Sequence, residues 1–340
     1  MFPSVDKLLA ADLRLDAASV AVPTVHHHSV ASPLLDAGID VLVEKPLAAS
    51  LAEADDLLER AAKGKRILQP GHLERFNPAV LAVEPKLRRP MFFEAHRLSV
   101  FTPRSLDVDV VLDLMIHDLD IVLTFAHSPV REVRAVGLPI LSPKVDIANV
   151  RVEFESGCVA NFTASRVSTE RVRKLRFFEP RQYVSIDYAR QDLLVIRVDE
   201  GEKQSGANLL AALPPHAVAL LPSGIKEALA AGTLDLSKID PAMIAQFAAI
   251  AKIDPAVLAQ LTGAGQSKGG LSLSKPTVAP GEPLRLEIES FLDAVRTRRQ
   301  PRVTARQGRA ALALALEIQS AMAAHATRAG LADFFAPNGA

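Results

Sequence analysis

The chain has 340 residues, 49% of them hydrophobic, and its 39 basic and 39 acidic side chains give a formal net charge of zero. This length can hold two domains with a large core, and the balanced charge argues against nucleic-acid binding, which needs clustered positive charge. The single cysteine, Cys158, excludes an intramolecular disulfide and a cysteine-based zinc site, and without a signal-peptide pattern or a membrane-spanning apolar run we expect a cytoplasmic protein that binds no membrane.

The first 22 residues predict a short helix followed by a strand. Residues 3–13 place Val5, Leu8 and Leu9 on one side of a helix, and residues 17–22 have the composition of a strand. A dinucleotide-binding domain normally opens with a strand, a Gly-x-Gly-x-x-Gly turn and a helix that meets the pyrophosphate. No glycine precedes Pro23, so this stretch does not hold that turn.

Three consecutive histidines, His26 to His28, lie near the start of the next predicted helix, over residues 24–35. Successive helical residues point about 100° apart, so three imidazoles in a row cannot converge on one ion. We therefore predict no metal site here.

Residues 41–46, Val-Leu-Val-Glu-Lys-Pro, are an apolar run that stops at two charges and a proline. This pattern is typical of a buried parallel strand, and Pro46 cannot continue the ladder. Glu44 and Lys45 then lie at the carboxyl end of the strand, which is the edge of an open α/β sheet where ligands bind. The alternative is a surface Glu–Lys pair that closes a strand.

A helix is predicted after this strand, over residues 51–63. Ser50 and Glu53 have the spacing of a capping box, and Gly64 is expected to take the left-handed conformation at the end of the helix.

The next strand is predicted over residues 66–70, with a polar loop over residues 71–78 at its carboxyl end. Arg75 and Asn77 are candidates to reach a cofactor or substrate there. Turn and capping roles fit them as well, and we slightly favour such a role for Asn77 because Pro78 follows it.

From residue 91 onward, short alternating runs predict consecutive strands joined by short turns. They indicate an antiparallel sheet, and so a second domain of α+β type. The predicted strands cover residues 91–101, 130–141, 147–154, 158–165, 174–178, 183–188 and 193–198.

A helix is predicted between the first two of these strands, over residues 108–125. Spacings of four and three place Asp113, His117 and Asp120 on one of its faces. An imidazole suits a proton acceptor near neutral pH, an ammonium such as Lys45 would stabilise a developing alkoxide, and a carboxylate one turn away would orient the imidazole and favour its protonated form. The alternative is a solvated acidic stripe with an ordinary histidine.

Residues 201–280 are rich in Ala and Leu and contain two helix starts of the form Asp-Pro. A substrate lid and an oligomer contact are both compatible with this segment, and we favour a passive pair of surface helices. Two helices are predicted after it, over residues 283–297 and 306–323.

Three motifs, in the right order and spacing, resemble the Gfo/Idh/MocA family of NAD(P)-dependent oxidoreductases of sugars and polyols. They lie at residues 21–27, 44–46 and 113–117. The resemblance implies a Rossmann-type parallel sheet without roughly its first 50–60 residues, about two strands and their helices. A misplaced start codon or a natural variant without its pyrophosphate grip would each account for this.

The family resemblance also implies the domain organisation. Residues 1–90 would form the truncated dinucleotide-binding domain, with a helix at about 304–325 packed back on it. Residues 91–200 and 281–303 would form a substrate and oligomerisation domain with a large open antiparallel sheet, and residues 201–280 would be an insertion. A homo-oligomer, dimer or tetramer, is expected because such sheets pair across subunits in the family.

By the same resemblance, His117 is the base, Lys45 anchors the substrate hydroxyl and the nicotinamide ribose, and Asp113 supports both. The residues expected at the cofactor, NAD or NADP, are Pro23, Thr24 (where the family usually has Asn), His27, Glu44, Lys45, Pro46 and Arg75. No metal is expected.

Loops 71–78 and 98–103 are similar to those of members that oxidise the 3-hydroxyl of UDP-N-acetylglucosamine for lipid A or surface polysaccharide. The substrate-binding candidates are Lys45, Asn77, Arg104, Arg166 and His117. Arg104 and Arg166 would meet the diphosphate through their planar guanidinium groups, although we favour surface salt bridges for both. The alternatives are a simple sugar or inositol as substrate, or a non-catalytic sensor or scaffold that lacks a complete cofactor site.

Overall fold

The computed structural model describes residues 1–11, 13–102, 108–198, 218, 221, 225–227, 271–331 and 334. The chain divides into two compact units, one formed by residues 1–195 and 274–340 and the other by residues 196–273. The site below belongs to the first unit, as does the fold apart from residues 196–198 and 271–273. Arg104 and the two helices predicted within residues 201–280 lie outside the described residues.

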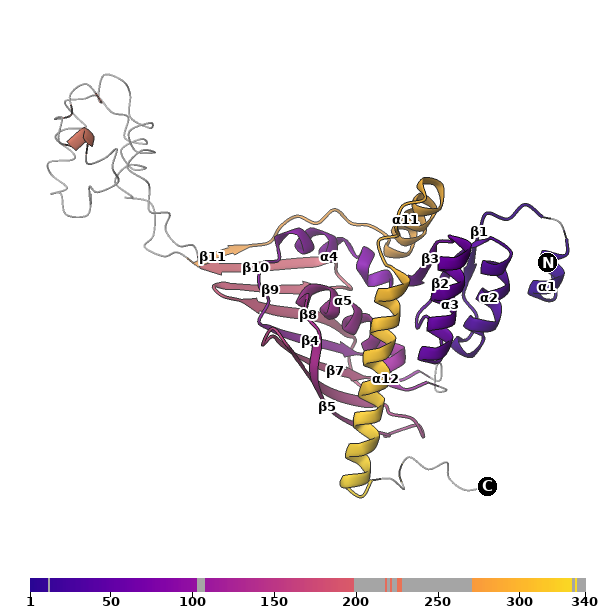
Figure 1. Ribbon diagram of the computed structural model, residues 1–340. Coiled ribbons are helices and arrows are strands. Elements are labelled where there is room, and N and C mark those ends of the chain that lie inside the picture. The colour runs from indigo at the N-terminus through magenta and orange to yellow at the C-terminus, as the bar shows by residue number, and fades with distance from the viewer. Residues whose placement is uncertain are drawn as a thin grey trace. The chain divides into compact units, whose positions relative to one another are not determined.

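A three-stranded parallel sheet comes first, in the order β1-β2-β3 (Figure 1). Its strands are β1 (Ala17–Val20), β2 (Asp40–Glu44) and β3 (Leu68–Gly71). Four of the five residues of β2 are buried, as expected of a central strand covered on both faces. The helices α1 (Val5–Leu9), α2 (His27–Asp36) and α3 (Leu51–Gly64) accompany these strands.

The two ends of α3 correct the sequence-based expectation. Ser50 caps the helix by accepting a hydrogen bond from the Glu53 amide at 3.2 Å, but the Glu53 carboxylate accepts from the amide of Ala49 instead of Ser50. At the other end Lys65, with φ +52°, takes the left-handed position, and Gly64 is the last helical residue. The helix therefore runs one residue further than its glycine suggested.

The second sheet has eight strands in the order β11-β10-β9-β8-β4-β7-β6-β5 (Figure 1). Strand β4 pairs antiparallel with β8 and parallel with β7, so the sheet is mixed, although mostly antiparallel. The strands are β4 (Phe92–Leu98), β5 (Val130–Leu138), β6 (Ile147–Phe154), β7 (Val159–Ser165), β8 (Val172–Glu179), β9 (Gln182–Asp187), β10 (Asp192–Val198) and β11 (Leu271–Ser274).

Two helices pack over one face of this sheet, α5 (Ile116–Ala126) and α12 (Ala305–Arg328). Helix α12 joins the two cores, because Leu312 packs in the core of the small sheet while Leu314 and Ile318 pack in that of the large sheet. Helix α5 is preceded by a single π-helical turn, η4 (Val111–Met115), where the sequence predicted one regular helix.

Other helical segments complete the fold. They are the 3-10 turns η1 (Thr24–His26), η2 (Leu73–Phe76) and η3 (Glu84–Lys86), and the helices α4 (Pro78–Val83) and α11 (Pro283–Thr297). Among the described helices, none combines the length and apolar character needed to cross a membrane.

Candidate active site

The site begins at the carboxyl ends of β2 and β3. Glu44, the last residue of β2, lies in register with Gly71, the last residue of β3. A Cβ on Gly71 would lie 3.1 Å from both the Cα and Oε2 of Glu44, so the two strand ends approach closely because this position is glycine. Lys45 and His72 follow directly and leave the sheet at the same edge; the Lys45–Pro46 peptide bond is cis.

Lys45 is held by the segment that leads into α5. Its Nζ donates a hydrogen bond to the backbone oxygen of Asp113 at 2.6 Å and lies 3.6 Å from the Asp113 carboxylate. Asp113 belongs to the π-helical turn η4, which places its backbone oxygen within reach. Burial lowers the pKa of Lys45, and the negative charges of Asp113 and Glu44 oppose that shift.

His117 lies in the first turn of α5, and its Nδ1 is buried without a hydrogen-bond partner among the described residues. Burial holds the pKa of His117 well below its usual value, and the positive charges of Lys45 and Arg97 lower it further. The imidazole is therefore uncharged at neutral pH and able to accept a proton.

The expected role of Asp113 needs one correction. The sequence suggested that this carboxylate orients His117 and favours its protonated form, but Asp113 forms its ion pair with Lys45. The groups that act most strongly on His117 are cationic and favour its neutral form. The π-helical turn changes the register between the two residues and so removes the simple one-turn relationship.

His72 belongs to the same surroundings and was not singled out from the sequence. It is 1% exposed, and neither ring nitrogen has a hydrogen-bond partner within the described part of the chain. Burial lowers its pKa, and the charges of Asp120, Arg75 and Lys45 act on it as well. Its place directly after a strand, at the same sheet edge as Lys45, was the signal that could have identified it.

A buried cluster of charged side chains around Arg97 was also not predicted from the sequence. Arg97 of β4 donates two hydrogen bonds to Asp118, at 2.7 and 3.0 Å, and a third to Glu74 at 3.1 Å. The Tyr188 ring lies 5.1 Å from its guanidinium carbon. Because Asp118 is next to His117, this cluster fixes the start of α5 against the large sheet.

The two polar candidates of loop 71–78 serve the framework. Asn77 caps α4, accepting from the Ala79 amide at 3.1 Å, and also donates to the backbone oxygen of Tyr188 at 3.0 Å. Arg75 is 3% exposed, donates to the Thr124 hydroxyl and lies 3.6 Å from Asp120. Both side chains are thus occupied by protein groups.

The residues before α2 lie at the end of β1. Pro23 is exposed, Thr24 is half-buried, and His27 is 1% exposed. The His27 ring contacts the backbone oxygens of Pro46 at 2.8 Å and Val22 at 2.9 Å, which ties the end of β1 to the segment after β2. A contribution of His27 to cofactor binding therefore acts through the position of Pro46.

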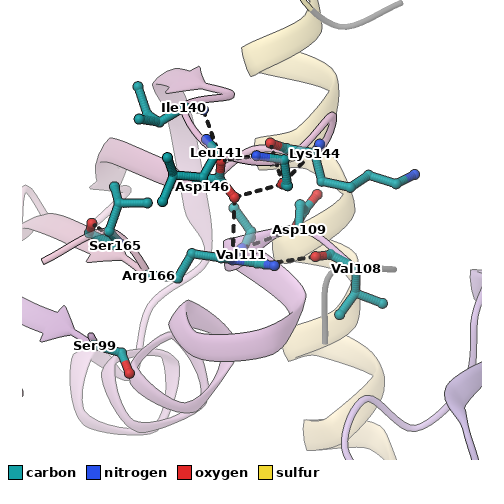
Figure 2. Close-up of polar contacts among 12 residues, drawn as sticks. Ser99, Val108, Asp109, Val111, Ile140, Leu141, Lys144, Asp146, Ser165 and Arg166 are labelled. Carbon is teal, nitrogen blue, oxygen red and sulfur yellow. Dashed lines mark hydrogen bonds and ion pairs between the residues drawn. The ribbon is translucent and has the colours of Figure 1, made fainter. Parts of the chain in front are cut away.

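Arg166 is buried, which corrects the expectation of a surface salt bridge. It is 5% exposed, donates to the backbone oxygen of Val108 at 2.7 Å, and lies 3.8 Å from Asp146 (Figure 2). Asp146 in turn accepts from the backbone amides of residues 140–142, which lowers its pKa even though burial opposes that shift. Arg166 thus stabilises the segment that enters η4 and has little freedom to reach a diphosphate.

A buried acid, Glu287 of α11, lies near the edge of the small sheet. It is 0% exposed, and neither carboxyl oxygen has a hydrogen-bond partner among the described residues. Burial, with a smaller contribution from the charge of Glu44, raises the pKa of Glu287 to about 8. The described residues contain no group of three or more His, Cys, Asp or Glu side chains placed to hold a metal ion.

Comparisons with known families agree with this architecture. Residues 1–72 match the family described as "Oxidoreductase family, NAD-binding Rossmann fold", and residues 80–181 match the "GFO/IDH/MocA C-terminal domain".

Several curated proteins are similar in sequence. UDP-N-acetylglucosamine 3-dehydrogenase of Acidithiobacillus ferrooxidans is 41% identical over 193 residues, which cover 56% of this chain and 61% of that protein. Inositol 2-dehydrogenase of Acidothermus cellulolyticus is 31% identical over 135 residues, 38% of this chain and 40% of that protein. The chain thus spans less than two thirds of the length of these relatives.

Solved structures extend the similarity to nearly the whole chain. UDP-N-acetylglucosamine 3-dehydrogenase from Acidithiobacillus ferrooxidans superimposes with a TM-score of 0.71 and 31% identity, covering 95% of this chain and 83% of that one. A Bordetella pertussis dehydrogenase solved with NADH and UDP-GlcNAcA shares the fold at a TM-score of 0.63 and 15% identity, covering 95% and 82% of the two chains. With both domain types matched in order, the chain belongs to the Gfo/Idh/MocA family of oxidoreductases.

Proposed function

We propose that the protein transfers a hydride between a secondary alcohol of a sugar and NAD or NADP, with Lys45, Asp113 and His117 as the reacting set. The observation that carries the proposal is an uncharged, half-buried imidazole, His117, close to the Lys45 ammonium, which is held by the Asp113 carboxylate. A passive scaffold has no need of that combination.

The residues at the sheet edge fit the nicotinamide side of such a cofactor. The unpartnered nitrogens of His72 and His117 and the ammonium of Lys45 gather beside the strand ends, where ligands bind in open α/β sheets. Pro23, Thr24, Glu44 and Pro46 would hold the cofactor there. When bound, it supplies the hydride acceptor.

The proposed proton transfer follows from the protonation states of two side chains, the positively charged Lys45 and the neutral His117. A substrate hydroxyl placed between Lys45 and His117 would give its proton to the neutral imidazole, and the ammonium would stabilise the oxygen as negative charge develops. Asp113 keeps Lys45 in place through the 2.6 Å backbone hydrogen bond. In the reverse direction the protonated His117 returns the proton to a ketone.

A nucleotide sugar is the preferred substrate, with oxidation at the 3-hydroxyl of UDP-N-acetylglucosamine. The relative with 41% identity, named for that reaction, supports this choice. A simple sugar or inositol is the second candidate, supported by the inositol 2-dehydrogenase at 31% identity.

A homo-oligomer in the cytoplasm, in lipid A or polysaccharide synthesis, is the setting we propose. The face of the large sheet turned away from α5 and α12 carries a row of three aromatic rings in contact. Phe178 lies between Phe92 and Tyr183, with ring centroids 5.4 and 5.1 Å away, and is 36% exposed. Neighbouring, partly exposed aromatic rings on an open sheet are typical of a surface that associates with another protein surface.

The test measures cofactor reduction with UDP-N-acetylglucosamine and with inositol, for the native chain and for His117→Ala. We expect turnover by the native protein and a loss of about 10²-fold or more in the variant, with NAD(H) binding retained. His26→Ala, which removes an exposed histidine, is the matched control. Full activity of His117→Ala would refute the assignment of the base.

Binding of NAD(H) to this chain is measured by calorimetry and compared with a version extended upstream in frame. Binding with turnover by either version supports an enzyme. If neither version binds the cofactor, the result favours a non-catalytic sensor or scaffold over an enzyme.

A further inference from the structure

A second arginine lies directly opposite Arg97 on the large sheet. Strands β4 and β8 are antiparallel, and their register pairs Arg97 with Arg173. Two residues that pair across neighbouring strands point to the same face of the sheet. Two positions along each strand, Ala95 pairs with Leu175 on this same face, and both are buried beneath the helices. Arg173 therefore projects on the side of the sheet that α5 covers. It lies near the start of β8, where the first three residues of the strand are only half-buried.

The two arginines differ in their partners. Arg97 is neutralised by Asp118 and Glu74, as described above. Arg173 is half-buried, yet no hydrogen bond or ion pair joins its guanidinium to any residue that the structure describes. A partly desolvated guanidinium without an anion is unfavourable, and an anionic ligand would remove that penalty.

The charges near Arg173 support an anion there. Burial lowers its pKa first, and the neighbouring positive charge of Arg97 lowers it further, whereas Glu74 and, less strongly, Asp118 act in the opposite direction. Arg171, exposed two residues earlier, adds another positive charge at the rim. Arg173 is also close enough to His117 for its charge to lower the pKa of that imidazole. The unpaired cation and the proposed base thus share one region.

We propose that Arg173, with Arg171 at the rim, binds the phosphate groups of a nucleotide-sugar substrate whose sugar hydroxyl lies at His117 and Lys45. This inference rests on the proposed function, and it names the residue that would recognise the phosphate groups of the proposed substrate class. The planar guanidinium matches phosphate oxygens in a bidentate arrangement. Arg166 is engaged by Val108 and Asp146, so Arg173 takes over the role considered for Arg166 in the sequence.

The test is calorimetric binding of uridine diphosphate to the native chain, Arg173→Gln and Arg173→Lys. We expect Arg173→Gln to weaken the binding of uridine diphosphate about tenfold or more. Arg173→Lys should retain part of the affinity, because it keeps the positive charge but loses the bidentate geometry of the guanidinium. Arg176→Gln is the matched control, since Arg176 is on the same strand but on the opposite face, paired with Glu94 at 2.9 Å. It should bind as the native chain does.

Turnover of inositol by the same variants separates this inference from the proposed function. Inositol has no phosphate, so Arg173→Gln should lose much less turnover with inositol than with UDP-N-acetylglucosamine, while the loss of the Arg173 charge raises the pKa of His117 equally in both assays. Native turnover of a sugar together with unchanged uridine diphosphate binding by Arg173→Gln would overturn the role of Arg173 and leave the enzyme assignment intact. Binding that depends on Arg173, without turnover of any sugar, would support the anion site and refute the dehydrogenase. Failure of the native chain to bind uridine diphosphate would also overturn the anion site.

Discussion

Lys45 Nζ donates a hydrogen bond to the backbone oxygen of Asp113 across 2.6 Å, joining two residues 68 positions apart in the sequence. The contact ties the carboxyl end of β2 to the turn that leads into α5. It fixes a positive charge beside His117, whose pKa that charge lowers. A hydrogen bond between a strand end and a helical turn therefore also adds to the effect of burial in favouring the neutral form of the proposed base.

Lys45→Met should raise the pKa of His117. The variant keeps the length of the side chain but removes a positive charge, so the imidazolium becomes less unfavourable. Burial, the larger cause, persists, so the pKa rises toward the ordinary histidine value of 6.5 without reaching it. The measurement is an NMR titration of the histidine rings, and the acid limb of the oxidation rate should move to higher pH in parallel.

Lys65→Met is the control for this titration, because Lys65 lies at the exposed end of α3. It should leave His117 unchanged. An unshifted His117 in Lys45→Met would show that the two groups are not coupled.

The sequence predicted those features of the site that depend on local order. An apolar run that stops at Glu44-Lys45-Pro46 implied a strand end, and the apolar period around Asp113 and His117 implied a helix, whereas their nearness to Lys45 was implied only by the family resemblance. The partners of Arg97 could not be read in the same way, because they come from a helix 21 residues away and a turn 23 residues away. Arg173 is singled out only by its register with Arg97, which requires the pairing of two strands.

Arg97→Met should destabilise the fold by about 3–5 kcal/mol, since it leaves Asp118 and Glu74 buried without their cation. The free energy of unfolding is measured by urea titration. Arg176→Met on the open face of the sheet is the control. Its partner Glu94 is 34% exposed, so the loss should stay below about 1 kcal/mol. Equal losses in both variants would contradict a stabilising role for the buried cluster.

Gly308→Ala should cost about 1–3 kcal/mol, because α12 approaches β3 closely at this residue. The added Cβ would lie 2.5 Å from Cγ and 2.8 Å from Cβ of Pro70, a rigid ring, and 3.7 Å from Nε2 of His72. Gly64→Ala is the control in another helix, where the nearest atom is the flexible Arg66 Cγ at 3.2 Å. Thermal unfolding measures both, and a neutral Gly308→Ala would mean that α12 can move away from the sheet.

Glu287→Gln should change the pH dependence of stability. With a folded pKa of about 8 against an ordinary 4.5, the folded state binds more protons than the unfolded state between these values. The native protein therefore loses stability as pH rises through this window, by up to about 1.4 kcal/mol per pH unit. The variant cannot ionise, so it should lose less and become the more stable protein at pH 8.

Urea unfolding of both proteins at several pH values between 5 and 8 tests this difference. Other titrating groups, such as His117, are common to the two proteins and cancel when their unfolding free energies are subtracted. Glu289→Gln, an exposed position on the same helix, should follow the native curve. Parallel curves for the native protein and Glu287→Gln would mean that the carboxyl ionises normally. Normal ionisation would require that the Glu287 carboxylate contacts solvent or a cation. Such contacts would contradict its complete burial and its nearness to the negative charge of Glu44.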